Sequence, residues 1–492
     1  MKRWRSRRWL LALGFLLAVF GCQSERPIGD AMGQLRTLER KGEFTRAEAL
    51  IDSLLGAAKL DSATRRRLLW DRERLSRIRL DYNLSRQDLL KALRERVRDF
   101  REAELDEWER EGKLDVRRID GEKRYLYASV SNLFWRYPEI RARRLPKENR
   151  WDSEHSFLAL VREARAAREK SAGRFVLPHR FRCTHTVEVH ADAVPAGKIV
   201  RCWIPFPRAF PFQNDIHLVD SEPAVKWLGE PESRARSAYL ERRSEPGVPT
   251  VFKVSYEFTA YATINSLEPA RIRPYDKSRP EYVYYTAERP PHIVFSEAFR
   301  ALSRRIVGGE TNPLLVARRI FNWIADSLAY SYAPEYSTIS NISQWVLQRR
   351  YGDCGQKALF FMTLCRLNGI PARWQSGWGI RPGHKSIHDW CEIYLEPYGW
   401  VPVDPDRGAA ANRYTETLTP GEKQEVVDFY FGNLDPFRMA ANCDHSVPLF
   451  PPKQSFRSDD VDFQRAEVEC DGQNVYFDKF DYSLEVKVLK HP

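Results

Sequence analysis

The chain has 492 residues, which is longer than the ~250–300 residues at which single hydrophobic cores stop growing, so a one-domain protein is excluded. Hydrophobic residues make up 43% of the chain and aromatic residues 12%, a composition that excludes a largely disordered protein. The formal net charge is +12, but acidic and basic residues alternate through residues 36–112. This alternation favours solvated helix surfaces over a nucleic-acid groove, so we expect no nucleic acid as a partner.

Residues 1–21 predict a signal peptide. Five basic residues within the first eight precede an apolar run from Leu10 to Phe20, which is too short to span a membrane. The sequence Val19-Phe20-Gly21-Cys22 resembles a bacterial lipobox, which implies cleavage before Cys22 and attachment of lipid to that cysteine. We therefore predict an exported protein of the bacterial cell envelope with a membrane anchor at Cys22. Plain secretion and an uncleaved anchor are the alternatives.

The following region predicts a helical domain over residues 22–172. Thr45 to Glu48 have the spacing of a capping box, and a second helix is expected near Ser85 with Leu89, Leu90 and Leu93 facing inward. The segment has no second copy at a fixed period, which argues against a repeat array.

Residues 173–265 show the two-residue period of strands and predict a β-sandwich. The runs 184–190 and 199–205 predict a hairpin with its turn near residues 194–197. Alternation places His185 and His190 on opposite faces, so we interpret them as polar residues of an exposed strand face and not as metal ligands.

Eight cysteines stand at positions 22, 183, 202, 354, 365, 391, 443 and 470. Export would permit disulfides among the six that remain after Cys22 and Cys354 are assigned, but the sequence does not pair them. A bridge between Cys183 and Cys202 would need a large register slip in the predicted hairpin. Cys365 and Cys391 lie in apolar surroundings and are expected to be free thiols.

Residues 266–412 contain the segment that carries chemistry. A Pro- and Tyr-rich connection leads to a helix that opens at Thr311-Asn312-Pro313. Residues 351–367 then form a turn followed by an almost wholly apolar helix, with Cys354 at its start. The unpaired N–H groups and dipole of a helix N-terminus stabilise a thiolate, so the position predicts a nucleophile; a structural cysteine is the alternative.

Two downstream residues complete a catalytic set. His388 opens a predicted strand and Asp404 ends the next one. A cysteine nucleophile needs an imidazole as base, and the imidazole needs an acceptor that fixes its orientation. Cys354, His388 and Asp404 therefore predict a catalytic triad that favours a thiolate and imidazolium pair near neutral pH.

These residues lie in motifs that resemble the transglutaminase-like superfamily. The motifs are Gly352-Asp353-Cys354, Gly369-Ile370-Pro371-Ala372-Arg373, His388-Asp389-Trp390 and Trp400-Val401-Pro402-Val403-Asp404-Pro405. The segments 335–339 and 431–435 look like an exported Bacteroidetes-type branch with a transglutaminase domain. The resemblance implies a papain-like α+β core, attack on an amide carbonyl through a thioester on Cys354, and no cofactor.

In such a site the backbone N–H of Cys354 and one upstream side chain would stabilise the oxyanion, with Tyr332, Gln344 and Trp345 as candidates. Trp374, Trp378, Trp390 and Trp400 either line a cleft or belong to the core. His384 and Cys391 lie near His388, but we assign no metal because His388 already serves the triad.

The sequence thus predicts an α+β multidomain protein. Its expected parts are a signal peptide (1–21), a helical domain (22–172), a β-sandwich (173–265), a transglutaminase-like core (266–412) and a C-terminal β-rich extension (413–492). The predicted activity is thiol-dependent hydrolysis or acyl transfer on a protein or peptide substrate; protease, deamidase and cross-linker are not separated. The alternative is a surface binding or scaffold protein with a vestigial core.

Overall fold

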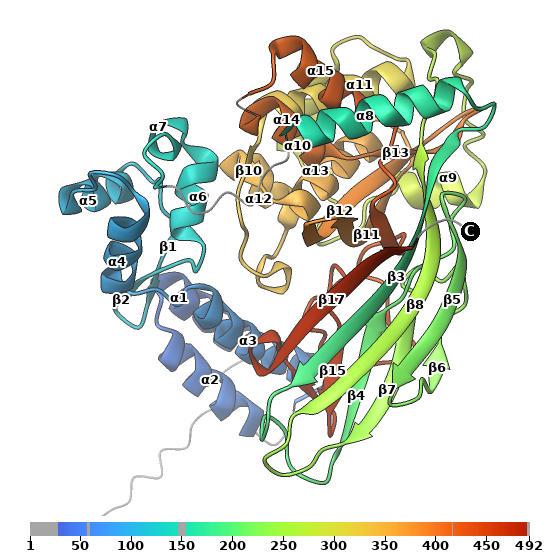
Figure 1. Ribbon diagram of the computed structural model, residues 1–492. Helices are drawn as coiled ribbons and strands as arrows, with labels where there is room; N and C mark the ends of the chain where they lie inside the picture. Colours follow the sequence, from blue (N-terminus) through green and yellow to red (C-terminus); the bar gives the residue numbers. More distant parts are fainter. Residues whose placement is uncertain (1–27, 57–59, 146–153, 416, 490–492) are drawn as a thin grey trace, which may run out of the picture. The chain divides into compact units, whose positions relative to one another are not determined.

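The structure is a computed structural model that describes residues 28–56, 60–145, 154–415 and 417–489 (Figure 1). It contains two compact units. The first consists of the described residues up to Arg72 together with Arg118–Glu122, and the second of Glu73–Arg117 and the residues from Lys123 onward. The predicted signal peptide and Cys22 lie outside the described residues. Within them, no helix is both long enough and apolar enough to cross a membrane.

The N-terminal third is helical, as predicted. Its elements are α1 (Ile28–Lys41), α2 (Phe44–Gly56), α3 (Ser62–Asp81), α4 (Arg86–Arg96), α5 (Glu102–Arg110), β1 (Val116–Ile119), β2 (Glu122–Tyr125), α6 (Ser129–Arg136), α7 (Pro138–Arg141) and α8 (Glu154–Glu169).

Local capping explains where helix α4 begins. Helix α4 starts after Ser85, which forms a capping box with Asp88, and buries Leu89, Leu90 and Leu93 as expected. The capping box predicted at Thr45 is wrong. Helix α2 begins one residue earlier, and Thr45 donates from its N–H and its hydroxyl to the carboxylate of Asp120, at 2.9 Å each.

Two antiparallel sheets form the predicted β-sandwich. Their strands are β3 (Phe175–Val189), β4 (Ile199–Pro205), β5 (Gln213–Glu222), β6 (Trp227–Leu228), β7 (Ser237–Arg243), β8 (Thr250–Thr263), β15 (Glu467–Cys470), β16 (Gln473–Val475) and β17 (Phe480–Leu489). One sheet has the order β17-β3-β8-β5 and the other β16-β15-β4-β7-β6. Figure 1 shows the C-terminal strand β17 beside β3, far from it in sequence. The C-terminal strands therefore complete both sheets.

The predicted hairpin between residues 184–190 and 199–205 is wrong. Strand β3 pairs with β8 and β17, and β4 pairs with β7 and β15, so the connection passes from one sheet to the other. The two runs share the alternation of strands, but alternation does not specify the partner strand.

His185 is also buried, which corrects its assignment to an exposed face. It lies on the inner face of β3 with Phe181 and Cys183, and its ring contacts Trp378 edge-on at 5.8 Å between centroids. Burial lowers the pKa of His185 to about 4, so the ring is neutral. His190 is exposed, as predicted, and contacts Asp481.

The core region combines helices with one antiparallel sheet. Its helices are α9 (Pro280–Thr286), α10 (Glu297–Val307), α11 (Pro313–Ser327), α12 (Ile342–Arg349), α13 (Cys354–Leu367), α14 (Pro405–Tyr414) and α15 (Pro420–Phe429). The sheet order is β13 (Gly399–Val403), β12 (His384–Leu395), β11 (Ala372–Arg381) and β14 (Arg438–Asn442). A short parallel pair, β9 (Ala329–Tyr330) and β10 (Tyr351–Gly352), lies beside α12 and α13. The core sheet thus takes its fourth strand from beyond residue 412.

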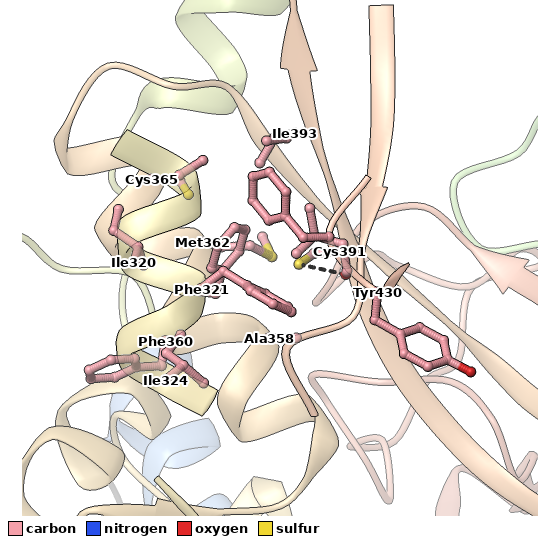
Figure 2. Close-up of a cluster of buried hydrophobic side chains, with 14 of the residues drawn as sticks. Ile320, Phe321, Ile324, Ala358, Phe360, Met362, Cys365, Cys391, Ile393 and Tyr430 are labelled. Carbon is pink, nitrogen blue, oxygen red and sulfur yellow. Dashed lines mark hydrogen bonds between the residues drawn. The ribbon is translucent and has the colours of Figure 1, made fainter. Parts of the chain in front are cut away.

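Helix α13 is the buried centre of this region, as its apolar sequence predicts. Figure 2 shows its side chains between those of α11 and those of β12; the labelled residues are Ile320, Phe321, Ile324, Ala358, Phe360, Met362, Cys365, Cys391, Ile393 and Tyr430. Each buried aromatic or large aliphatic side chain contributes roughly 1.5–3 kcal/mol of transfer free energy. Cys365 and Cys391 are free thiols in this core, as expected, and Cys391 donates to the carbonyl of Val403 at 3.3 Å.

Candidate active site

Cys354 is the first residue of α13 and is only partly exposed. The preceding Asp353 caps the helix, because its carboxylate accepts from the N–H of Gln356 at 3.0 Å and the side chain of Gln356 accepts from the N–H of Asp353 at 3.3 Å. This reciprocal cap fixes the start of the helix at Cys354. The buried Nε2 of Gln356 has no hydrogen-bond partner among the described residues.

The space beside Cys354 admits only a glycine at position 355. A Cβ on Gly355 would lie 2.6 Å from Oδ2 of Asp389 and 2.8 Å from the ring of Trp374. Tyr336 also approaches this point, and its hydroxyl donates to Asp353 at 2.6 Å. Helix α13 therefore begins in close contact with strands β11 and β12.

The thiol of Cys354 donates to Oδ2 of Asp389 at 3.4 Å. The other carboxylate oxygen of Asp389 accepts from Nε2 of Gln464 at 2.7 Å, and the same Nε2 donates to the backbone carbonyl of His388 at 2.8 Å. Gln464 thereby fixes the segment of β12 that faces the thiol.

His388 and Asp404 form the second part of the site. Nε2 of His388 lies 2.7 Å from Oδ2 of Asp404, and both side chains are buried. Asp404 also pairs with Arg438 at 2.7 Å, and its Oδ1 accepts from the N–H of Arg407 at the start of α14. Burial alone would raise the pKa of Asp404, but the interaction with the His388 ring and the positive charge of Arg438 hold that pKa below its usual range.

The structure brings His388 to Asp404, but no hydrogen bond joins Cys354 to His388 in the part of the chain that it describes. Consecutive strand residues point to opposite faces, which explains why the thiol meets Asp389 and not its neighbour. Hydrogen bonds between a catalytic nucleophile and its base are often long in free enzymes and tighten when substrate binds. The triad of Cys354, His388 and Asp404 therefore stays a prediction.

The ionisation of the resting thiol differs from the expectation drawn from the helix N-terminus. Burial raises the pKa of Cys354 well above its ordinary value, and the charges of Asp389 and Asp353 raise it further. Burial lowers the pKa of His388, although Asp404 opposes this change. The resting pair is therefore a neutral thiol and a neutral imidazole, since burial and two carboxyls outweigh the helix dipole.

The predicted oxyanion candidates lie in different places. Gln344 accepts at Oε1 from the hydroxyl of Ser296 at 3.2 Å, and the ring of Trp345 packs edge-on against Tyr351 at 5.3 Å. Tyr332 follows β9, which pairs with the residues before Cys354. Tyr332 is 39% exposed, and its ring packs edge-on against Tyr330 at 5.4 Å between centroids.

Three of the four tryptophans belong to the core. Trp374 and Trp390 are fully buried and Trp378 is 6% exposed, whereas Trp400 is half-buried beneath the guanidinium of Arg373. Among the described residues, no group of three or more His, Cys, Asp and Glu side chains is arranged to hold a metal ion.

Sequence reasoning missed Asp389, Tyr336, Arg438 and Gln464. Asp389 stands inside the His388-Asp389-Trp390 motif, and its position one residue after His388 on a strand was the signal that it faces the other side. Tyr336 lies in the segment 335–339, which resembles the exported branch, but that resemblance gave it no role. Arg438 and Gln464 are distant in sequence from the motifs, and their sequence surroundings gave no indication of contact with the site.

Comparison with known proteins agrees with this geometry. Residues 300–405 match the family model described as the transglutaminase-like superfamily. An uncharacterized protein of Haemophilus influenzae is 23% identical over 363 residues, which cover 63% of this chain and 92% of that protein. The uncharacterized protein YebA of Bacillus subtilis is 23% identical over 176 residues, which cover 32% of this chain and 23% of that protein.

Among solved structures, a proposed cysteine protease from Cytophaga hutchinsonii aligns with 15% identity and a TM-score of 0.42, over 65% of this chain and 93% of that one. The periplasmic domain of TgpA from Pseudomonas aeruginosa aligns with 16% identity and a TM-score of 0.26, over 55% of this chain and 95% of that one. The apolar helix that opens with Cys354, the strand that carries His388, and Asp404 directly after β13 all lie within the segment that the family model matches. Residues 300–405 of this chain are therefore a transglutaminase-like domain.

Proposed function

We propose that the protein is a thiol-dependent hydrolase or acyltransferase that acts on amide bonds of protein or peptide substrates through a thioester on Cys354. The observation that carries this proposal is the buried pair of His388 and Asp404 close to the thiol. His388 precedes Asp389 on the same strand, and Asp389 contacts the thiol of Cys354. Asp404 holds the imidazole in one orientation, as a base for a nearby nucleophile requires.

The proposed reaction has two steps. His388 takes the thiol proton of Cys354 while the sulfur attacks the amide carbonyl, and the resulting imidazolium returns that proton to the leaving amine. The thioester then passes to water, which gives hydrolysis, or to a second amine, which gives transfer. The backbone N–H of Cys354 at the start of α13 is the proposed oxyanion donor.

A specific observation favours the alternative, a surface binding protein with an inactive core. The thiol contacts Asp389 and not His388, and four aromatic residues, Tyr275, Tyr282, Tyr394 and Trp400, line a surface depression beside α9. In that case Cys354 would be an ordinary thiol and the depression the binding site.

An electrophilic thiol probe distinguishes the two functions. We expect the probe to label Cys354 selectively and peptide libraries to be cleaved, with amine incorporation into the product only if the enzyme is an acyltransferase. Equal labelling of Cys354 in the wild type and in His388→Ala, with no turnover of any library, would support the binding protein.

We further propose that the protein is exported and held at the bacterial envelope by lipid on Cys22. The support is the basic N-terminus, the short apolar run and the lipobox-like sequence before Cys22.

A further inference from the structure

Residues 430–438 hold Asp404 at two points. The N–H of Asp404 donates to the carbonyl of Tyr430 at 2.9 Å, and Nη1 of Arg438 lies 2.7 Å from Oδ2 of Asp404. These residues connect α15 to β14 and follow the segment that the family model matches. They include residues 431–435, which resemble an exported branch of transglutaminase-domain proteins but receive no role from that resemblance. The structure places this stretch beside the end of β13, which leads into Asp404.

The guanidinium of Arg438 is fixed by Asp435. Nε and Nη2 of Arg438 both donate to Oδ2 of Asp435, at 3.1 and 2.8 Å. The same oxygen accepts from the hydroxyl of Tyr430 at 3.3 Å. The guanidinium also lies over the ring of Trp390, 4.9 Å from its centre. These contacts hold Arg438 in one orientation and leave its Nη1 for Asp404.

Oδ2 of Asp404 is shared between an imidazole and this guanidinium. Nε2 of His388 and Nη1 of Arg438 each lie 2.7 Å from it. Among the described residues Nη1 has no aligned hydrogen bond, so its contact is an ion pair and the hydrogen bond to Oδ2 comes from the imidazole. Oδ1 of Asp404 accepts from the N–H of Arg407 at 2.9 Å. The carboxylate therefore cannot rotate without losing contacts at both oxygens.

The side chains of His388, Asp404, Asp435 and Arg438 are all buried, so their charges must balance one another. Asp404 and Asp435 supply two negative charges and Arg438 supplies one positive charge, while the resting imidazole is neutral. An imidazolium on His388 would complete the balance. The arrangement therefore suits a base that takes up a proton during the reaction.

Other charged or titratable groups also face His388. They are Arg407 on α14, His384 on the same strand, and Cys354 and Asp389 on the side of the thiol. Burial and the positive charges of Arg407 and Arg438 lower the pKa of His388, whereas Asp404 raises it. Removal of Arg438 therefore has an effect of known direction on His388.

We propose that Arg438 is a positioning residue of the active site. Held by Asp435, it fixes the carboxylate of Asp404. Through that carboxylate it keeps the ring of His388 in the orientation that serves the thiol of Cys354. A buried ion pair adds little net stability over apolar residues of similar size, so stability alone does not explain it. The inference rests on the proposed function, since it assigns a further role within the same site.

Alkylation of Cys354 by iodoacetamide, followed across pH by mass spectrometry, tests this role without a substrate. In the wild type we expect the rate to rise in two steps as pH increases. His388 first loses its proton and becomes a base, and the thiol itself ionises at higher pH. His388→Ala should retain only the second step. The first step thus reports the base alone.

The double variant Arg438→Gln, Asp435→Asn removes the ion pair and leaves neither partner as an unpaired buried charge. We expect the rate of the first step to fall about tenfold, because the imidazole is less well oriented. That step should also move to higher pH, because the charge of Arg438 no longer opposes the imidazolium. The second step should stay in place. The matched control Arg373→Gln, Glu392→Gln removes another arginine–carboxylate pair, 2.6 Å apart across β11 and β12, and should keep both steps.

Asp435→Asn alone gives an independent test, which also serves if urea unfolding shows that the double variant does not fold. It leaves the charge of Arg438 uncompensated beside Asp404. The first step should therefore move to lower pH, opposite to the shift in the double variant. A general loosening of the site would move the first step to higher pH in both variants, because burial lowers the pKa of His388.

The outcomes separate this inference from the proposed function. A first step that is missing in the wild type contradicts His388 as the base, and with it both proposals. A first step that is present in the wild type and unchanged in both variants overturns only the positioning role. Movement of the two steps toward each other in the double variant also overturns that role, because it would show that the site has become exposed.

Discussion

The thiol of Cys354 donates to Asp389 at 3.4 Å, while the imidazole of His388, the preceding residue on the same strand, binds Asp404 at 2.7 Å. The resting nucleophile is therefore held by a carboxyl and not by the base. Turnover through His388 requires the thiol to leave Asp389. The roles of His388 and Asp389 can therefore be measured separately.

Replacing Cys354 with alanine should abolish turnover and leave the fold intact. Alanine is compatible with the first turn of α13, and the cap formed by Asp353 and Gln356 does not involve the thiol. We expect activity at the level of the uncatalysed reaction and a free energy of unfolding within ~1 kcal/mol of the wild type. The assays are library cleavage and urea unfolding; turnover comparable to the wild type would contradict the assigned nucleophile.

Replacing Asp389 with asparagine should make Cys354 more reactive. In its ionised form Asp389 raises the pKa of the thiol, while burial and the charges of Asp462 and Asp353 raise the pKa of Asp389 itself. The uncharged amide of asparagine keeps a similar shape and can still contact Gln464. Alkylation by iodoacetamide, followed across pH by mass spectrometry, should reach its midpoint at lower pH, with a rate at pH 8 roughly tenfold above the wild type. An unchanged or higher midpoint would show that Asp389 does not hold the thiol proton.

Asp353 should make the protein less stable as pH rises. Burial raises the pKa of Asp353 to about 7, so the folded state retains a proton that the unfolded chain releases near the ordinary pKa of 3.8. The stabilisation from this proton is complete below about pH 4 and is lost as pH rises toward 7. Asp353→Asn preserves the helix cap and should reduce the loss of stability between pH 5 and pH 8 by a few kcal/mol at most. Urea unfolding at both pH values measures this; parallel curves for the two proteins would argue against a buried proton.

Cys22→Ser tests the proposed anchor. The hydroxyl of serine cannot form the thioether that a lipobox cysteine carries, so metabolic labelling with a fatty acid should mark the wild-type protein and not the variant. The variant should also leave the membrane fraction. Equal labelling of both proteins would place the lipid elsewhere or exclude it.

The elements that sequence predicts well here are those whose signals are local. The helix start near Ser85, the helix after Asn312 and the burial of α13 follow from neighbouring residues, and the structure confirms them. The partner of β3 and the burial of His185 depend on which distant strands pair, and alternation along one strand carries no such information.

The candidate site divides in the same way. The motifs predict Cys354, His388 and Asp404 as the site residues, and the structure brings the last two into contact. The contact of the thiol with Asp389 depends on the direction in which one strand residue points. Arg438 and Gln464 enter the site from segments beyond the matched family domain. Their contributions therefore required the three-dimensional arrangement.

Asp404→Asn tests the mechanism through the pH dependence of kcat/KM. Burial lowers the pKa of His388 and raises that of Cys354, so the wild-type profile should be bell-shaped, with protonation of His388 on the acid limb and ionisation of the thiol on the basic limb. The negative charge of Asp404 favours imidazolium, and its removal should lower the pKa of His388 further. The acid limb should then move to lower pH. The maximal rate should fall by roughly three to four orders of magnitude, because the amide no longer orients the imidazole or stabilises its charge.

The wild type and Asp389→Asn serve as references, since Asp389→Asn is expected to move the basic limb alone. If the acid limb stays in place in Asp404→Asn and the rate falls only slightly, His388 is not the base that Asp404 orients, and the proton of Cys354 must pass to Asp389.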